Sequence, residues 1–257
     1  MRNIITFFLL FLTSYLQAQL SPPGMGDVEE AAWFAMGLKQ PLNKEKSVES
    51  MTYFGVGFTN ENELDKSLDK PSIVVINQEF YQHLNNNWKL SYAVSYRNQW
   101  ENNIDSGSLQ REKQHEMRLY SRISYSTNLG KVKLTQTARQ EARKFVDENW
   151  KNTENHFQLR SRVKTQAAVN LDQHNEHALT AGVEILFSTS KNKLSNQWSQ
   201  FKYKESRLTF YYTYHPKEVP VAISLGYMNN LIEKKSSHSV HYASFDVVWE
   251  DPFHIFS

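Results

Sequence analysis

The feature of this chain that most limits its fold is a long series of runs in which apolar and polar residues alternate. A period of two is typical of a β-strand that has one face in an apolar environment and one in a polar environment. Clusters of Asn, Asp, Gly, Pro and Lys separate the runs. The pattern predicts strands at 31–39, 48–59, 72–84, 88–101, 114–127, 132–146, 156–171, 177–189, 201–214, 221–231 and 239–250.

The predicted strands are longer than the usual strand of about 5–6 residues. A strand that crosses a bilayer at a tilt needs about 9–11 residues. In the run at 88–101, Leu90, Tyr92 and Val94 share one face. Lys89 and Ser91 share the opposite face. This combination predicts an all-β transmembrane barrel with apolar side chains toward lipid and a polar lumen.

The number of strands is constrained by parity. Eleven runs are found, whereas bacterial single-chain barrels usually have an even number of strands. We therefore expect a single antiparallel up-and-down barrel of about 12 strands, with 10 as the alternative. A further strand would come from residues 19–29 or from residues 253–257.

The connections between the runs alternate in length. Short turns are expected at 40–47, 85–87, 128–131, 172–176 and 215–220, and longer loops at 60–71, 102–113, 147–155, 190–200 and 232–238. Outer-membrane barrels place short turns on the periplasmic side and longer loops outside the cell. The first strand would therefore begin on the extracellular side.

The pattern of the N-terminal residues indicates a targeting segment. Arg2 precedes an apolar run at 4–12, and Ala18 offers a small residue for cleavage. The run is shorter than the roughly 20 residues of a membrane-spanning helix, so it predicts a signal peptide over 1–18. Residues 19–29 are expected to be an irregular lead-in, and 30–257 the barrel. The chain has no cysteine, which excludes disulfides and a lipoprotein anchor.

Composition restricts the partners. The chain has 29 Lys and Arg against 27 Asp and Glu, so its charge does not suggest nucleic-acid binding. Mean hydropathy is −0.62, which in a barrel is compatible with lipid contact because only alternate residues face the membrane. The expected location is the outer membrane of a Gram-negative cell, with outer-membrane lipid or lipopolysaccharide and the barrel-assembly machinery as partners.

Several segments resemble a known family. The hairpin at 84–90 (LNNNWKL), followed by Ser-Tyr-Arg at 95–97, looks like the repeated L-N-x-x-W-x-L … Y-R units of an uncharacterised barrel family, domain of unknown function 2490. The strands at 116–122 (EMRLYSR), 157–162 (FQLRSR) and 181–185 (AGVEI) are similar to its middle strands. The resemblance covers most of 30–250 and implies an outer-membrane location without an established activity. The C-terminus departs from the pattern, since Pro252 follows the last strand.

A charged group on the polar faces of the central strands is the main candidate site. If the alternation holds, its members point into the lumen: Arg118, Arg122, Arg139, Glu141, Arg143, Arg160, Arg162 and Glu184, with Lys133 and Lys164 beside them. One interpretation is an ion-pair network that fills a narrow lumen, with Glu79 also pairing. A second is a basic constriction that attracts small anionic solutes. A third is a site for an acidic lipid or polysaccharide.

Other chemistry is weakly supported. A serine hydrolase needs a serine beside a histidine, but His238 and Ser239 are adjacent and face opposite ways, and His241 and Ser244 also face apart. His174, Glu176 and His177 could bind a metal, although a polar turn explains them equally. We therefore expect no catalytic residues, no metal and no cofactor. The favoured function is a narrow channel or a structural or binding barrel. The alternatives are a membrane-embedded hydrolase or lipid-modifying enzyme and a soluble periplasmic ligand-binding barrel.

Aromatic residues near the strand ends have a separate use. Outer-membrane barrels carry girdles of Tyr and Trp at the two membrane interfaces. The residues expected in the girdles are Trp33, Tyr53, Trp88, Trp100, Tyr125, Trp150, Trp198, Tyr214, Tyr227 and Trp249.

Overall fold

The computed structural model describes residues 22–25, 28–59, 70–105, 108–233 and 238–255. The expected signal peptide over 1–18 lies outside these residues, as does part of the expected lead-in. No helix in the described residues is long and apolar enough to cross a membrane.

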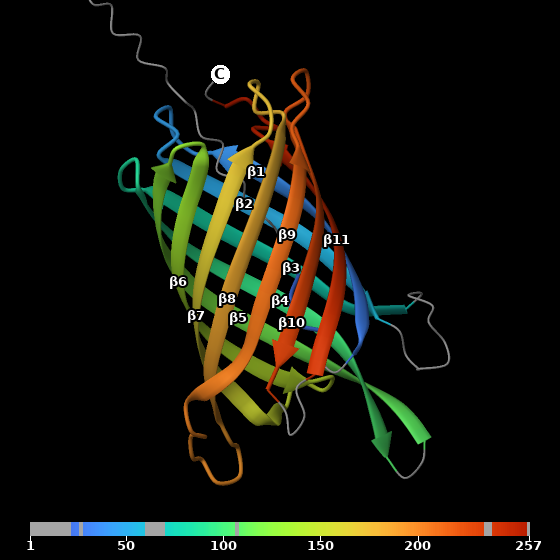
Figure 1. The fold of residues 1–257 in the computed structure, drawn as a ribbon. Helices are drawn as coiled ribbons and strands as arrows, with labels where there is room; N and C mark the ends of the chain where they lie inside the picture. Colours follow the sequence, from blue (N-terminus) through green and yellow to red (C-terminus); the bar gives the residue numbers. More distant parts are fainter. Residues whose placement is uncertain (1–21, 26–27, 60–69, 106–107, 234–237, 256–257) are drawn as a thin grey trace, which may run out of the picture.

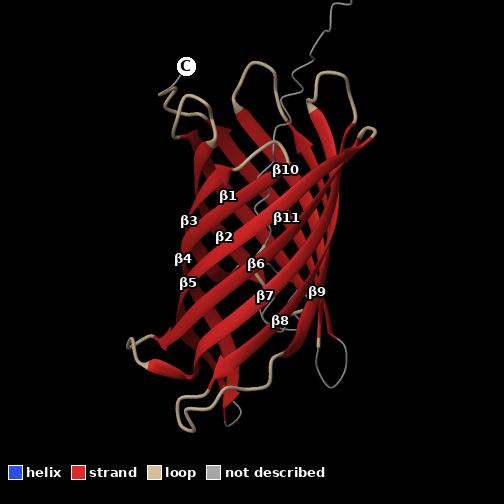
Figure 2. Cartoon of the chain, turned by 90° about the vertical axis from the view of Figure 1, so that its left-hand side faces the viewer, coloured by secondary structure: helices blue, strands red, loops and turns tan. Residues whose placement is uncertain are grey.

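The described residues form one β-sheet that closes on itself as a barrel (Figure 1). Its strands are β1 (Glu30–Pro41), β2 (Val48–Thr59), β3 (Lys70–His83), β4 (Trp88–Asp105), β5 (Ser108–Leu129), β6 (Val132–Asp147), β7 (Asn152–Asn170), β8 (His177–Lys191), β9 (Lys202–Tyr214), β10 (Val221–Ile232) and β11 (His238–Glu250). Each run of alternating residues in the sequence corresponds to one of them. The strands lie strongly tilted and wrap around a single lumen (Figure 2).

The expected strand number of 12, or 10, was wrong. The described chain has eleven strands, and the barrel closes through a parallel pairing of β1 with β11, from Glu30 beside His241 to Lys39 beside Glu250. All other neighbouring pairs are antiparallel. The sheet is therefore mixed rather than purely antiparallel, because an odd number of up-and-down strands brings two parallel strands together at closure.

Residues beyond the last strand brace this closure. The main-chain N–H of Asp251 donates to the carbonyl of Lys39 over 2.7 Å. The buried side chain of Gln40 donates to the Asp251 carboxylate over 2.6 Å and accepts from the N–H of Phe253 over 3.2 Å. The segment around Pro252 thus ends β11 and ties the C-terminal end of the barrel to β1.

The two ends of the barrel differ. The turns that follow β1, β3, β5, β7 and β9 lie together at one end, called here the short-turn end, which is uppermost in Figure 1 and also carries the C-terminus. The other connections lie at the opposite end. The expected long loops at 102–113 and 147–155 were wrong, because β4 and β5 continue as a paired hairpin to Asp105 and Ser108, and only residues 148–151 separate β6 from β7. Figure 1 shows this hairpin projecting from the barrel wall.

The two faces of the sheet differ in chemistry. Every strand presents at least one large apolar side chain to the exterior, such as Met36, Leu119 and Val163, which are 65%, 63% and 57% exposed. The side chains between them point inward and include most of the buried polar and charged groups. The exterior is thus apolar and much of the interior is polar, as the alternation predicted.

One sector of the interior is apolar. Side chains of β1, β2, β3, β10 and β11 form a buried cluster that includes Trp33, Met51, Ile73 and Met228. Trp33 is only 1% exposed and lies over Gly55, where a Cβ atom would come within 2.2 Å of the indole. The assignment of Trp33 and Tyr53 to an interfacial girdle was wrong, since both side chains pack in the interior.

Aromatic residues at the rims do face outward. At the short-turn end the rings of Trp88 and Tyr125 lie with their centroids 4.9 Å apart, and Trp249 is 48% exposed. At the opposite end Trp150 and Trp198 are 57% and 46% exposed. Exposed aromatic side chains therefore lie near both ends of the barrel.

The parallel closure can be tested by cross-linking, since the chain has no native cysteine. Ala32 and Ala243 are paired neighbours on β1 and β11 and both belong to the outward-facing positions. The double variant Ala32→Cys/Ala243→Cys should form an intramolecular disulfide on oxidation, detected as a shift in gel mobility. The control Ala32→Cys/Leu225→Cys, with the second cysteine on β10, should not. A twelfth strand between β1 and β11 would abolish the first cross-link.

Candidate functional site in the barrel lumen

A network of ion pairs crosses the middle of the lumen. In the described residues, seven arginines contact five glutamates, which leaves two positive charges in excess within the network. The arginines are Arg97, Arg118, Arg122, Arg139, Arg143, Arg162 and Arg207, and the glutamates are Glu79, Glu116, Glu141, Glu184 and Glu205. These residues come from β3 to β9, and the inward positions of the alternation place them together.

Glu141 is the centre of the network. Its carboxylate is fully buried and lies 2.6 Å from Arg139 Nε and 2.8 Å from Arg162 Nε. Glu116 has a similar role in the next layer, where Arg143 donates to both of its oxygens and Arg118 lies 2.7 Å away. Buried carboxylates are stable only when paired in this way, since desolvation of a lone charge costs several kcal/mol.

Tyr120 links the network to β3. Its hydroxyl donates to Glu79 over 2.9 Å, and Arg122 also contacts Glu79 at 3.0 Å. The guanidinium carbons of Arg139 and Arg122 lie 3.7 Å and 5.0 Å from the centroid of the tyrosine ring. Cation–π contact therefore holds two arginines beside one another despite their like charge.

The structure places all eight residues of the predicted charge cluster in the lumen. Seven of them belong to the ion-pair network, whereas Arg160 donates to Gln158 over 2.6 Å. Five network members were absent from the predicted cluster: Glu79, which was named only as a further pairing partner, and Arg97, Glu116, Glu205 and Arg207. The same alternation would have found Glu116 beside Arg118, and Glu205 beside Arg207, because both pairs have a spacing of two.

A short stretch of the N-terminal region lies inside the lumen. The carbonyls of Gly24 and Pro22 accept hydrogen bonds from Arg97 at 2.8 Å and Arg207 at 3.3 Å. The N–H of Met25 donates to the hydroxyl of Tyr242 over 3.1 Å, and the Met25 side chain packs in the apolar cluster. Residues 22–25, called here the lumen segment, thus fill space beside the network and are held mainly through main-chain groups.

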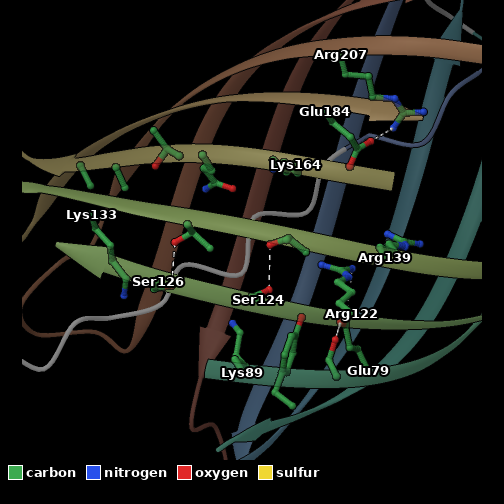
Figure 3. Close-up of a pocket in the computed structure, with 18 of the residues that line it drawn as sticks. Glu79, Lys89, Arg122, Ser124, Ser126, Lys133, Arg139, Lys164, Glu184 and Arg207 are labelled. Atoms are coloured by element: carbon green, nitrogen blue, oxygen red, sulfur yellow. Dashed lines mark hydrogen bonds and ion pairs between the residues drawn. The ribbon is translucent and has the colours of Figure 1, made fainter. Parts of the chain in front are cut away.

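A cavity of about 760 Å³ extends through the lumen from the short-turn end into the network. Its inner part is lined by network arginines, among them Arg97, Arg118 and Arg139, together with Pro22 and Pro23. At its mouth are residues of the turns that follow β5, β7 and β9, including Lys131, Asp172 and His215. The space between is lined by lysine, serine and threonine side chains (Figure 3).

The turn at the mouth is organised by Asp172. Its carboxylate accepts hydrogen bonds from the main-chain N–H groups of His177, Glu176 and His174 at 2.9, 3.2 and 3.1 Å. These bonds, that of His177 first, lower the pKa of Asp172, so the carboxylate at the mouth is charged at neutral pH. Glu176 pairs with Lys217, and His177 is bonded to Tyr212. The described residues contain no cluster of three or more metal-binding side chains.

The exterior carries one group that the sequence analysis overlooked. Ser239 and His241 have a spacing of two and share the outward face of β11, where His241 is paired with Asn229 of β10 and Ser239 with Leu231. Asn229 donates to the hydroxyl of Ser239 over 2.6 Å, whereas His241 Nδ1 is bonded to the hydroxyl of Tyr227 at 2.8 Å. Within the described chain no hydrogen bond joins Ser239 to His241, so the contact that activates a serine nucleophile is not formed there.

Comparisons with known proteins identify a family whose function is unknown. A family model described as "Protein of unknown function (DUF2490)" matches residues 30–241. A structure of P. aeruginosa FpvA bound to heterologous pyoverdines is similar at 10% sequence identity and a TM-score of 0.31, and the match covers 81% of this chain. The chain corresponds to only 38% of the length of that chain. No curated protein matches.

Substitution of Glu141 tests whether the network stabilises the barrel. Glu141→Gln keeps the size of the side chain but leaves three arginines without their shared carboxylate. We expect a loss of about 3–5 kcal/mol in the free energy of unfolding, measured by urea titration of the folded protein in detergent. The outward-facing neighbour provides the control, because Gln140→Ala should change stability by less than about 0.5 kcal/mol. Equal stability of the two variants would contradict a structural role for the network.

Proposed function

We propose that this chain, which belongs to the DUF2490 family of unknown function, is an outer-membrane barrel with a closed, basic lumen. The single observation that carries this proposal is the inversion of polarity across the sheet. Apolar side chains cover the exterior, and buried arginines and glutamates occupy the interior.

The exterior supports a membrane location. Soluble monomers rarely expose a continuous apolar surface of more than a few hundred Å². Here every strand contributes outward-facing apolar side chains, and the strands have 12 to 22 residues, enough to cross a bilayer at a tilt. A soluble ligand-binding barrel would have the opposite polarity, with apolar side chains inside. The exterior therefore favours lipid as the surrounding medium.

The lumen supports a binding barrel over an open pore. The ion-pair network spans several strands at mid-height, and the lumen segment packs beside it against the apolar cluster. A water-filled pore would need a continuous polar path between the two ends. The cavity at the short-turn end instead meets paired arginines and Pro22 at its inner limit.

The longest connections support one orientation, because those between β2 and β3 and between β8 and β9 have ten residues each, whereas no connection at the short-turn end has more than six. Short turns face the periplasm in outer-membrane barrels. With the short-turn end on that side, the mouth of the cavity would be open to periplasmic solutes, and the projecting β4–β5 hairpin would face the cell exterior.

The location predicts the behaviour of the protein during fractionation. The full-length chain, expressed in a Gram-negative host, should sediment with the outer membrane and resist extraction by high salt or carbonate. The folded form should also migrate faster than the boiled form on a gel, as closed barrels resist detergent unfolding. Recovery of the folded protein in the soluble periplasm without detergent would contradict the proposal.

Closure of the lumen predicts the conductance of the protein. In planar bilayers the intact protein should show no stable single-channel steps, whereas deletion of residues 22–25 should produce them. Tyr242→Phe removes the hydroxyl that accepts from Met25 and should cause brief openings. Tyr212→Phe, on the outward face of β9, is the matched control and should remain closed. Stable steps from the intact protein would show an open channel and refute closure.

A further inference from the structure

We infer that the cavity at the short-turn end is a binding site for a small phosphorylated solute, recognised by Lys89, Lys133 and Lys164. This assignment gives a ligand class to the lumen of the proposed barrel, and it relies on the proposed orientation only for how the solute enters. The three lysines and the hydroxyl groups between them are shown in Figure 3.

In the described part of the chain the lysines form no ion pair; Glu184, which lies opposite Lys164 in the register, is paired with Arg162 instead. Each lysine is partly buried and lines the cavity. The ammonium nitrogen of Lys89 lies 4.8 Å from the centroid of the Tyr81 ring. The network farther in already has an excess of arginine over glutamate. A confined space with so many positive charges favours an anion as its counter-charge.

The register of the strands brings two of the lysines to the same level. Lys89 of β4 pairs with Ser124 of β5, Ser124 with Thr137 of β6, and Thr137 with Lys164 of β7. The two lysines are thus separated along the wall by three strand spacings, roughly 14 Å, with two hydroxyls between them. Lys133 lies nearer the mouth, opposite Asn128.

The hydroxyl groups form two pairs at this level and the next. The oxygens of Ser124 and Thr137 are 2.9 Å apart, and those of Ser126 and Thr135 are 3.0 Å apart. In each pair one hydroxyl donates to the other, so the accepting hydroxyl keeps a proton that can be donated to a ligand oxygen. The wall therefore offers neutral donors between positive charges, which suits the oxygens of a phosphate.

The type of cation favours phosphate over carboxylate. Arginine recognises a carboxylate through a planar, two-pronged contact, and the arginines that line the cavity beside the lysines already contact the protein's own glutamates, as Arg122, Arg139 and Arg162 do. The lysines are ammonium ions, which bind as point charges and donate hydrogen bonds to the tetrahedral oxygens of phosphate from several directions. The volume of about 760 Å³ lies within the range of small-molecule sites and leaves room for a sugar beside the phosphate.

Calorimetry with the full-length folded protein in detergent tests the inference. The probes are fructose 1,6-bisphosphate, inorganic phosphate, citrate as a carboxylate of similar charge, and fructose as the neutral counterpart. The bisphosphate should bind most tightly, and its affinity should fall as salt is raised because the contacts are ionic. Fructose should not bind. Citrate binding as tight as that of the bisphosphate would overturn the assignment to phosphate.

Single substitutions identify the residues. Lys89→Gln, Lys133→Gln and Lys164→Gln should each weaken bisphosphate binding about tenfold or more, as expected for loss of one charge-assisted hydrogen bond. Lys44→Gln is the matched control, since Lys44 is exposed in the turn after β1 at the same end and does not line the cavity. Gel mobility of the folded form verifies that each variant is a closed barrel. If the three lysine variants bind as tightly as the control, the inference is wrong.

The binding experiment can fail independently of the fractionation experiment that tests the proposed location. Binding is measured in detergent and does not depend on the location of the protein in the cell. A protein that binds the bisphosphate but fractionates outside the outer membrane would refute the proposed location and leave the site intact. A protein that resides in the outer membrane without binding any phosphorylated probe would refute the site alone.

Discussion

The structure depends on one constraint: each strand of a closed barrel has one face outside and one face inside. Because side chains alternate along a strand, a single choice of register sorts every residue between the two environments. In this chain the choice places Leu119 and Val163 outside and Arg118 and Arg162 inside. A shift by one residue would expose buried glutamates and arginines to the exterior, so the charged lumen and the apolar exterior determine each other.

Closure of the barrel shows where sequence reasoning succeeded and where it failed. All eleven strands could be found from the alternation, since it is a local property of the chain. The expectation of 12 strands came from a rule about parity, which the parallel pairing of β1 with β11 does not follow. That pairing joins the two ends of the barrel domain and leaves no local pattern. The bonds from Gln40 to Asp251 and Phe253 that brace it connect residues more than 200 positions apart.

The candidate site was predictable in part. The inward positions of the charged residues followed from their spacing, as did the pairing of Glu79, Glu141 and Glu184 with arginines. The lumen segment could not be anticipated, because its contacts run through main-chain carbonyls of Pro22 and Gly24, which any sequence could supply. The sequence also did not predict which lumen cations pair with glutamates, the arginines, and which form no ion pair in the described residues, the three lysines. This difference depends on which strands are neighbours and at what level their residues meet.

These features combine into one physical account. The ion pairs and the lumen segment close the middle of the barrel, and the lysines remain at the end where the cavity is open. The lysines add to the excess of arginine over glutamate in the network, and they lie where a solute could reach them. In the proposed outer-membrane location, the apolar exterior would be surrounded by lipid.

Fluorescence of single-cysteine variants along β4 tests the central claim most directly. Positions 90, 92, 94 and 96 belong to the outward face and 89, 91, 93 and 95 to the inward face. With an environment-sensitive label in lipid vesicles, the outward positions should be quenched by spin-labelled lipid and not by iodide, and the inward positions should not be quenched by the lipid. Quenching by lipid that does not alternate along the strand, or that is strongest at the inward positions, would contradict a charged lumen inside a lipid-facing barrel.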